Sequence, residues 1–62
     1  MTAEDSLRHA EELMERLEQT RARLEATSDP DAAIEVLSEL AQIAKDVEAA
    51  LSQAKREADA QA

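Results

Sequence analysis

The sequence of 62 residues contains no cysteine, no glycine and no aromatic residue, and it has a single proline. Without cysteine, the chain forms no disulfide and offers no thiolate ligand to a metal. Alanine, glutamate and leucine dominate instead, and arginine and glutamine are also present, which is typical of long helices and not of sheets or turn-rich folds. We therefore expect an all-α protein.

Basic charge is scarce as well. Seven Lys and Arg stand against fifteen Asp and Glu, so the formal net charge is −8. An acidic excess spread over both halves of the chain repels nucleic-acid phosphates and anionic lipid surfaces. The few basic residues are interspersed with acids and have no aromatic side chains beside them on which bases stack. We expect no direct nucleic-acid binding by this chain alone and no membrane partner.

Long hydrophobic runs are also missing. No segment approaches the ~20 apolar residues that span a bilayer. Near the amino terminus, Glu4 and Asp5 stand where a signal peptide needs a basic stretch and then an apolar one. The sequence therefore predicts a soluble, cytoplasmic protein.

What the sequence does contain is a ladder of apolar residues at alternating steps of four and three. This spacing is typical of the buried stripe of a coiled-coil helix. In the second half of the chain the stripe consists of Ala33, Leu37, Leu40, Ala44, Val47, Leu51, Ala54 and Ala58. In the first half it consists of Ala3, Leu7, Ala10, Met14, Leu17, Arg21 and Leu24, with Leu13 beside it. At such a position, Arg21 can fix register, pair with an acid of a partner or extend its guanidinium into water.

The boundaries of two helices follow from capping residues. Thr2 and Asp5 have the spacing of a capping box at the start of the first helix. Asp29 is a suitable N-cap for the second helix, with Pro30 at its first position, where the missing N–H costs nothing. The connection is short, so the helices must be antiparallel neighbours.

We accordingly predict one domain over residues 1–62. It has a helix over about 3–27, a turn over about 28–30 and a helix over about 30–59, followed by a frayed tail over 60–62. The fold class is an antiparallel helical hairpin of two long helices.

A lone hairpin of this size has few large apolar side chains to bury. The large apolar side chains are seven Leu, two Ile, two Val and two Met, and full burial of each contributes roughly 1.5–3 kcal/mol. Ordering costs roughly 1.5 kcal/mol for every residue. The comparison favours association of the hairpin with other helices into a coiled-coil-like bundle.

The second helix has the wider apolar face, because Ile34 and Ala41 border its stripe on one side and Val36, Ile43 and Ala50 on the other. A partner as narrow as the first helix leaves part of this face uncovered, and exposed apolar patches mark interaction surfaces. The first helix carries a flank of glutamates at seven-residue spacing that faces water or a basic partner: Glu4, Glu11, Glu18 and Glu25. We expect the interface with another chain to consist of Ile34, Val36, Leu37, Leu40, Ile43, Val47 and Leu51.

No constellation for catalysis is recognisable. His9 is the only histidine and lies on the polar side of its helix near Glu12 and Glu15, in the order His-x-x-Glu and not the Glu-x-x-His order of di-iron bundles. The glutamates have no cleft to desolvate them, and Ser28 and Ser38 have no base nearby. The sequence predicts no catalytic residue, no metal site, no cofactor and no enzyme activity.

Residues 17–55 resemble the small subunit of exodeoxyribonuclease VII. The resemblance is carried by Leu17-Glu18, Arg23-Leu24-Glu25, Asp31-Ala32-Ala33-Ile34, Leu37, Ala44, Val47, Leu51 and Ala54. The family's two glycines, its phenylalanine, its cysteine and the Glu of its Ala-Glu pair correspond here to Thr27, Leu40, Leu37, Val47 and Lys55. The resemblance implies a non-catalytic accessory subunit, which coats a long helical segment of a large subunit that degrades single-stranded DNA.

Length, turn position and heptads are also similar to those of the plasmid copy-number regulator Rop, an antiparallel four-helix dimer that binds paired RNA loops. The RNA-binding face of that family uses Lys, Asn, Gln and Phe, where this chain has Ala3, Ala10, Met14, Glu18 and Glu25. This resemblance implies the architecture and not the RNA binding. Two functions stay open: an accessory module of a single-strand DNA exonuclease complex, or a self-contained homodimeric four-helix bundle of structural or regulatory role. The expected partners are accordingly the chain itself, as a homodimer or higher oligomer, and a long helix of a larger subunit.

Overall fold

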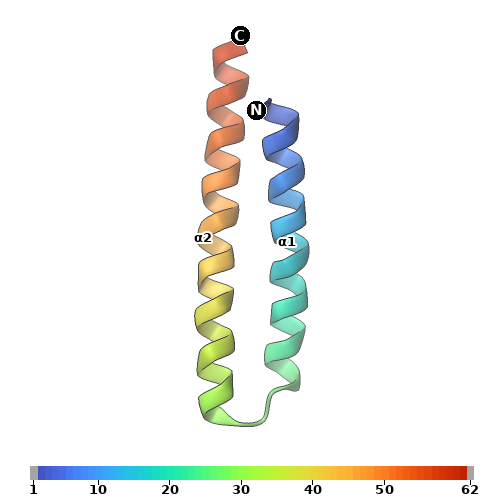
Figure 1. The fold of residues 1–62 in the computed structure, drawn as a ribbon, viewed down its shortest axis with the longest axis vertical. Helices are drawn as coiled ribbons and strands as arrows, with labels where there is room; N and C mark the ends of the chain where they lie inside the picture. Colours follow the sequence, from blue (N-terminus) through green and yellow to red (C-terminus); the bar gives the residue numbers. More distant parts are fainter. Residues whose placement is uncertain (1, 62) are drawn as a thin grey trace.

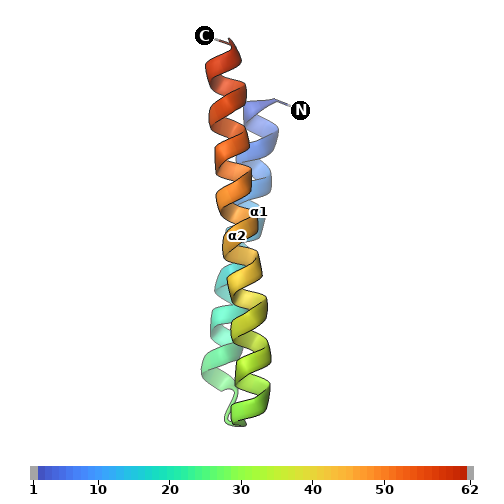
Figure 2. The ribbon, with the colours of Figure 1, turned by 90° about the vertical axis from the view of Figure 1, so that its left-hand side faces the viewer.

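The computed structural model describes residues 2–61, which form two helices joined by a short turn (Figure 1). Helix α1 spans Ala3–Ala26 and helix α2 spans Pro30–Gln61. The helices lie side by side and antiparallel in a rod of 49 × 14 × 12 Å, and the end of α2 extends beyond the start of α1 (Figures 1 and 2). The predicted all-α helical hairpin is confirmed.

Both predicted helix caps are present. The backbone N–H of Asp5 donates to the Thr2 hydroxyl and the backbone N–H of Thr2 donates to the Asp5 carboxylate, each at 3.2 Å. The N–H of Ala32 donates to the Asp29 carboxylate at 3.1 Å, and Pro30 takes the first helical position. These bonds satisfy N–H groups that have no partner within their own helix.

The helix ends differ slightly from the predicted ones. Helix α1 stops at Ala26, one residue early, because Thr27 is already extended and its hydroxyl donates to the Arg23 carbonyl at 2.7 Å. Helix α2 runs two residues further than predicted, since Ala60 and Gln61 are helical and not frayed. Alanine and glutamine are good helix formers, and no breaker precedes them. Ala62, the last residue of the predicted tail, lies outside the described residues.

The interior between the helices is a ladder of side chains at alternating steps of three and four, as in a coiled coil. The buried members are Ser6, Ala10, Leu13 and Thr20 of α1 and Val36, Ile43, Ala50 and Ala54 of α2. Leu17, Leu24, Leu40 and Val47 are half-buried between them. Most of these side chains are small, so the hairpin closes around a thin core.

The predicted stripes are wrong by one residue at every second position. In α1, Leu7, Met14 and Arg21 were expected to point inward, but Ser6, Leu13 and Thr20 are buried in their place. In α2, Leu37, Ala44 and Leu51 are likewise exposed, and their preceding neighbours Val36, Ile43 and Ala50 are buried. The observed register buries the short Thr20 side chain and leaves the Arg21 guanidinium in water, which avoids the cost of desolvating a charge.

Candidate interaction surface

Large hydrophobic side chains remain exposed on the hairpin. Leu37 is 50% exposed, Leu51 44%, Leu7 47% and Met14 43%, and Ile34 is the most exposed at 64%. Scattered exposed leucines are common on protein surfaces, whereas a row of them marks a contact site. Whether these side chains form a contact site therefore depends on whether they lie in a row on one side of the hairpin.

These side chains lie along one side of the hairpin. A groove of about 400 Å³ runs between the helices near the turn, and it is lined by Leu17, Glu18, Arg21, Leu37, Leu40, Ala41 and Ala44. Met14 and Leu7 precede Arg21 by seven and fourteen residues, and Leu51 follows Ala44 by seven, so they continue the two walls of this groove toward the open end. We call Leu7, Met14, Leu37, Ala44 and Leu51 the apolar face.

A row of carboxylates borders the apolar face on α1. Glu18 lines the groove, and Glu4, Glu11 and Glu25 share its side of the helix because they stand at seven-residue intervals. We call these four residues the acidic border.

Arg21 binds two of the four carboxylates of the acidic border. Its Nε donates to both carboxylate oxygens of Glu18 at 3.1 and 3.2 Å, and its Nη1 donates to Glu25 at 2.6 Å. Hydrogen bonds from Arg21, reinforced by its charge, hold the pKa of Glu18 below the usual value of 4.5. The same contacts raise the pKa of Arg21. The Arg21 side chain is 48% exposed, so of the alternatives open for this residue the hairpin adopts the one that keeps the guanidinium in water.

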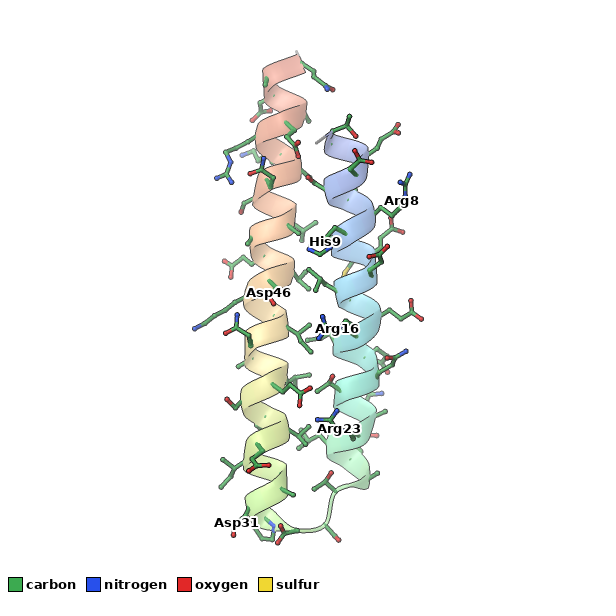
Figure 3. All side chains as sticks on the ribbon, viewed as in Figure 1. Arg8, His9, Arg16, Arg23, Asp31 and Asp46 are labelled. Carbon is green, nitrogen blue, oxygen red and sulfur yellow. The ribbon has the colours of Figure 1, made fainter. Side chains whose placement is uncertain are left out.

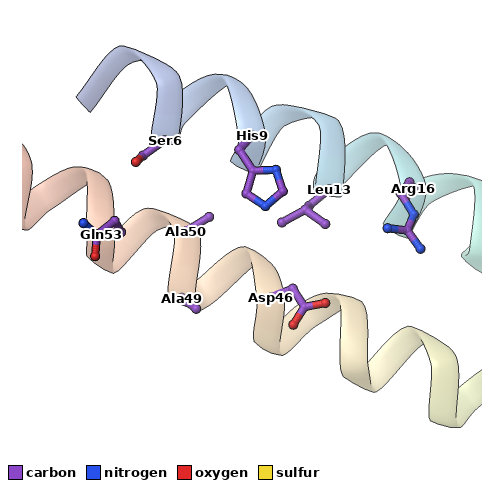
Figure 4. A pocket seen from close by; sticks show the side chains of 8 residues that line it. All are labelled: Ser6, His9, Leu13, Arg16, Asp46, Ala49, Ala50 and Gln53. Atoms are coloured by element: carbon purple, nitrogen blue, oxygen red, sulfur yellow. The ribbon is translucent and has the colours of Figure 1, made fainter. Parts of the chain in front are cut away.

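The opposite side of the hairpin is polar. A second groove of about 400 Å³ has Leu13 and Ala50 among its lining residues, together with the polar side chains Ser6, His9, Arg16, Asp46 and Gln53 and with Ala49 (Figure 4). His9 and Arg16 come from α1 and face α2, from which Asp46 and Gln53 come (Figures 3 and 4). Seven residues after Arg16, Arg23 donates a hydrogen bond to Glu39 of α2. On this side a hydrogen bond links the two helices, and polar side chains make up most of the groove's lining residues.

The residues of the predicted partner interface differ in how far they are exposed. Ile34, Leu37 and Leu51 are exposed, Leu40 and Val47 are half-buried, and Val36 and Ile43 are only 6% and 3% exposed between the helices. Val36 and Ile43 therefore bind α1 and offer no surface in the hairpin. Leu7 and Met14 were not expected on this surface, although their seven-residue spacing beside the acidic border indicates it.

His9, the one histidine, is exposed at the rim of the polar groove. Within residues 2–61, no three His, Asp or Glu side chains gather closely enough to hold a metal ion. In the same range, neither helix has a segment of the length and hydropathy that crossing a bilayer requires. The chain matches no family model, no curated protein and no solved structure.

Proposed function

We propose that this hairpin is a non-catalytic interaction module on whose apolar face a helix of another chain docks. The observation that carries the proposal is the row of half-exposed side chains along one side, at the heptad spacing that helix-in-groove recognition uses for its anchors. On the opposite side Arg23 of α1 is hydrogen-bonded to Glu39 of α2, and most of the residues that line the groove there are polar. The hairpin thus offers one apolar side, and it is long enough to receive a helix of several turns.

The resemblance to the small subunit of exodeoxyribonuclease VII supports a more specific form of this proposal. Leu37, Ala44 and Leu51, which carry part of that resemblance, lie on the apolar face. In this form the partner is a long helical segment of a large nuclease subunit in the cytoplasm, and the hairpin itself carries no step of the chemistry. The rival form, a homodimeric four-helix bundle, uses the same face for a second copy.

The proposal is tested with a synthetic amphipathic peptide of about four heptads that has Leu at its inward positions and Gln at the flanking ones. The chain has no aromatic residue, so a fluorophore on the peptide reports peptide binding without background. Leu37→Glu places a charge on the apolar face, and Ser38→Glu places the same charge one residue away on the exposed outer surface of α2. We expect anisotropy titrations to show binding to wild type and Ser38→Glu and its loss in Leu37→Glu, because docking would remove water from a charged carboxylate at the centre of the apolar contact.

Circular dichroism provides the control, since both variants should keep the helicity of the wild type. Equal binding by all three proteins, or no binding by the wild type, contradicts the proposed function. For the nuclease form, a purified large subunit with a long helical segment should bind wild type and Ser38→Glu and fail to bind Leu37→Glu.

A further inference from the structure

We propose that the helix docked on the apolar face is basic, with Lys or Arg flanking its apolar stripe, and that it belongs to a different protein and not to a second copy of this chain. The inference rests on the proposed function and adds the charge and the source of the partner.

The first observation is the charge on the borders of the apolar face. The α1 side carries the four glutamates of the acidic border. The α2 side carries four residues at the same seven-residue spacing, Ile34, Ala41, Glu48 and Lys55. Five carboxylates thus stand against two cations, Arg21 and Lys55, which leaves a net of three negative charges. A helix in the groove places its flanking positions beside these borders, so cations there meet carboxylates.

The second observation is that the free carboxylates are concentrated at one end. Near the turn, Glu18 and Glu25 are both bonded to Arg21. Near the open end, Glu4 and Glu11 form no ion pair with any other residue of the described range 2–61. They stand beside Leu7 and Met14, whose exposed side chains supply the apolar contact there. The cations of the partner should therefore be densest opposite Glu4 and Glu11.

The third observation is that a second copy fits this charge pattern less well. A two-fold dimer that sets α1 against α1 brings two acidic borders together. In a two-fold dimer that sets α1 of one copy against α2 of the other, residues face each other at the same heights along the rod as within the hairpin. There, Arg23 lies opposite Glu39 and Ser6 opposite Glu57. Glu48 of the copy then falls between Glu11 and Glu18, and only Lys55 of the copy offsets the carboxylates. Like charges facing each other across an interface disfavour that partner.

The test compares three labelled peptides that share the apolar stripe and differ only at the flanking positions, which are Lys, Gln or Glu. Titrations of the full chain should give the order Lys, Gln, Glu, with the Lys peptide bound at least about tenfold more tightly than the Glu peptide at low ionic strength. The difference should shrink as salt is added, because the flanking charges are exposed and screened.

Charge reversal locates the contact on the molecule. Glu11→Lys should weaken binding of the Lys peptide roughly three- to tenfold and strengthen binding of the Glu peptide. The matched control is Glu15→Lys, which makes the same charge change four residues on, at an exposed position that lines neither groove. It should change either affinity much less than Glu11→Lys does.

The outcomes separate the inference from the function on which it rests. Equal binding of the three peptides overturns the basic partner and leaves helix docking standing, whereas binding of none of them removes both. Sedimentation equilibrium of the chain alone tests the second copy. A tight dimer that strengthens with added salt, and that Glu11→Lys also strengthens, would show that a second copy covers the face and would overturn the inference.

Discussion

The Ser6 hydroxyl of α1 donates a hydrogen bond to the Glu57 carboxylate of α2, across the open end of the hairpin and over 51 positions of sequence. Ser6 is 1% exposed, so this bond lies inside the ladder of packed side chains. Near the turn, Arg23 and Glu39 form the corresponding link on the polar side. The register of the two helices is thus fixed near both ends by polar pairs, and the thin apolar core lies between them.

The Ser6 and Glu57 pair should behave as a coupled unit. A double-mutant cycle with Ser6→Ala and Glu57→Ala should give a coupling free energy of about 1.5–3 kcal/mol, the net contribution of one hydrogen bond to a charged group. Urea unfolding followed by circular dichroism measures it. The control cycle pairs Ser6→Ala with Glu48→Ala, which lies elsewhere on α2, and there the two effects should add. Additivity in both cycles would show that the bond does not stabilise the hairpin.

Leu13 and Met14 are adjacent in sequence and similar in size, yet the fold gives them opposite roles. Leu13 is 4% exposed and Met14 is 43% exposed. Leu13→Ala should lower the free energy of unfolding by about 2–4 kcal/mol, because it leaves a cavity in the core. Met14→Ala should lower it by less than about 1 kcal/mol. The reverse order in urea unfolding would mean that the two helices pack along the other stripe.

Arg21 should control the titration of Glu18. The folded-state pKa of Glu18 lies below 4.5 chiefly because Arg21 donates hydrogen bonds to its carboxylate. The resulting stabilisation is complete above the unfolded-state pKa and is lost as the pH falls through the folded-state pKa. In Arg21→Gln the pKa of Glu18 should rise toward its usual value, as followed by ¹³C NMR of the side-chain carboxyl.

Arg16→Gln is the matched control, since Arg16 lines the opposite groove and its loss should leave the Glu18 titration where it is. The loss of stability caused by Arg21→Gln should also shrink in acid, once Glu18 is protonated in both proteins. A loss that stays constant down to acid pH would mean that Arg21 stabilises the helix by packing and not by its charge.

Asp29 should be the more important of the two aspartates that flank Pro30. Its carboxylate accepts the N–H of Ala32, so Asp29→Ala should lower the free energy of unfolding by about 1 kcal/mol. Asp31→Ala removes an equal charge from the first turn of α2 without removing a cap. Only a few tenths of a kcal/mol are expected there from the helix dipole. Equal losses in thermal unfolding would show that the charge and not the cap is what matters.

The elements of this fold were predictable because local chemistry determines them. Thr2 with Asp5 and Asp29 with Pro30 are short-range patterns, and each performs the capping role that the sequence indicates. The two long periodic stretches left no alternative to helices, and the short turn left no alternative to a hairpin.

The register was not predictable in the same way, because α2 has two overlapping stripes of similar hydrophobicity, one through Leu37 and Leu51 and one through Val36 and Ile43. Which of them faces α1 depends on how both helices fit together. The decisive residues are polar: Thr20 can be buried at little cost, and Arg21 has Glu18 and Glu25 beside it on the surface. The leucine at position 37 was therefore assigned to the hairpin interior as well as to the partner interface, and the structure places it on the surface.

The measurement that tests the apolar face most directly is methyl NMR of the full chain, labelled at Leu, Ile, Val and Met, during titration with the Lys-flanked peptide. Large shifts are expected for the methyl groups of Leu7, Met14, Leu37 and Leu51, and small ones for Leu13 and Ile43, which stay packed between the helices. Shifts centred on Leu13 beneath the polar groove, or spread evenly over all methyl groups, would contradict it.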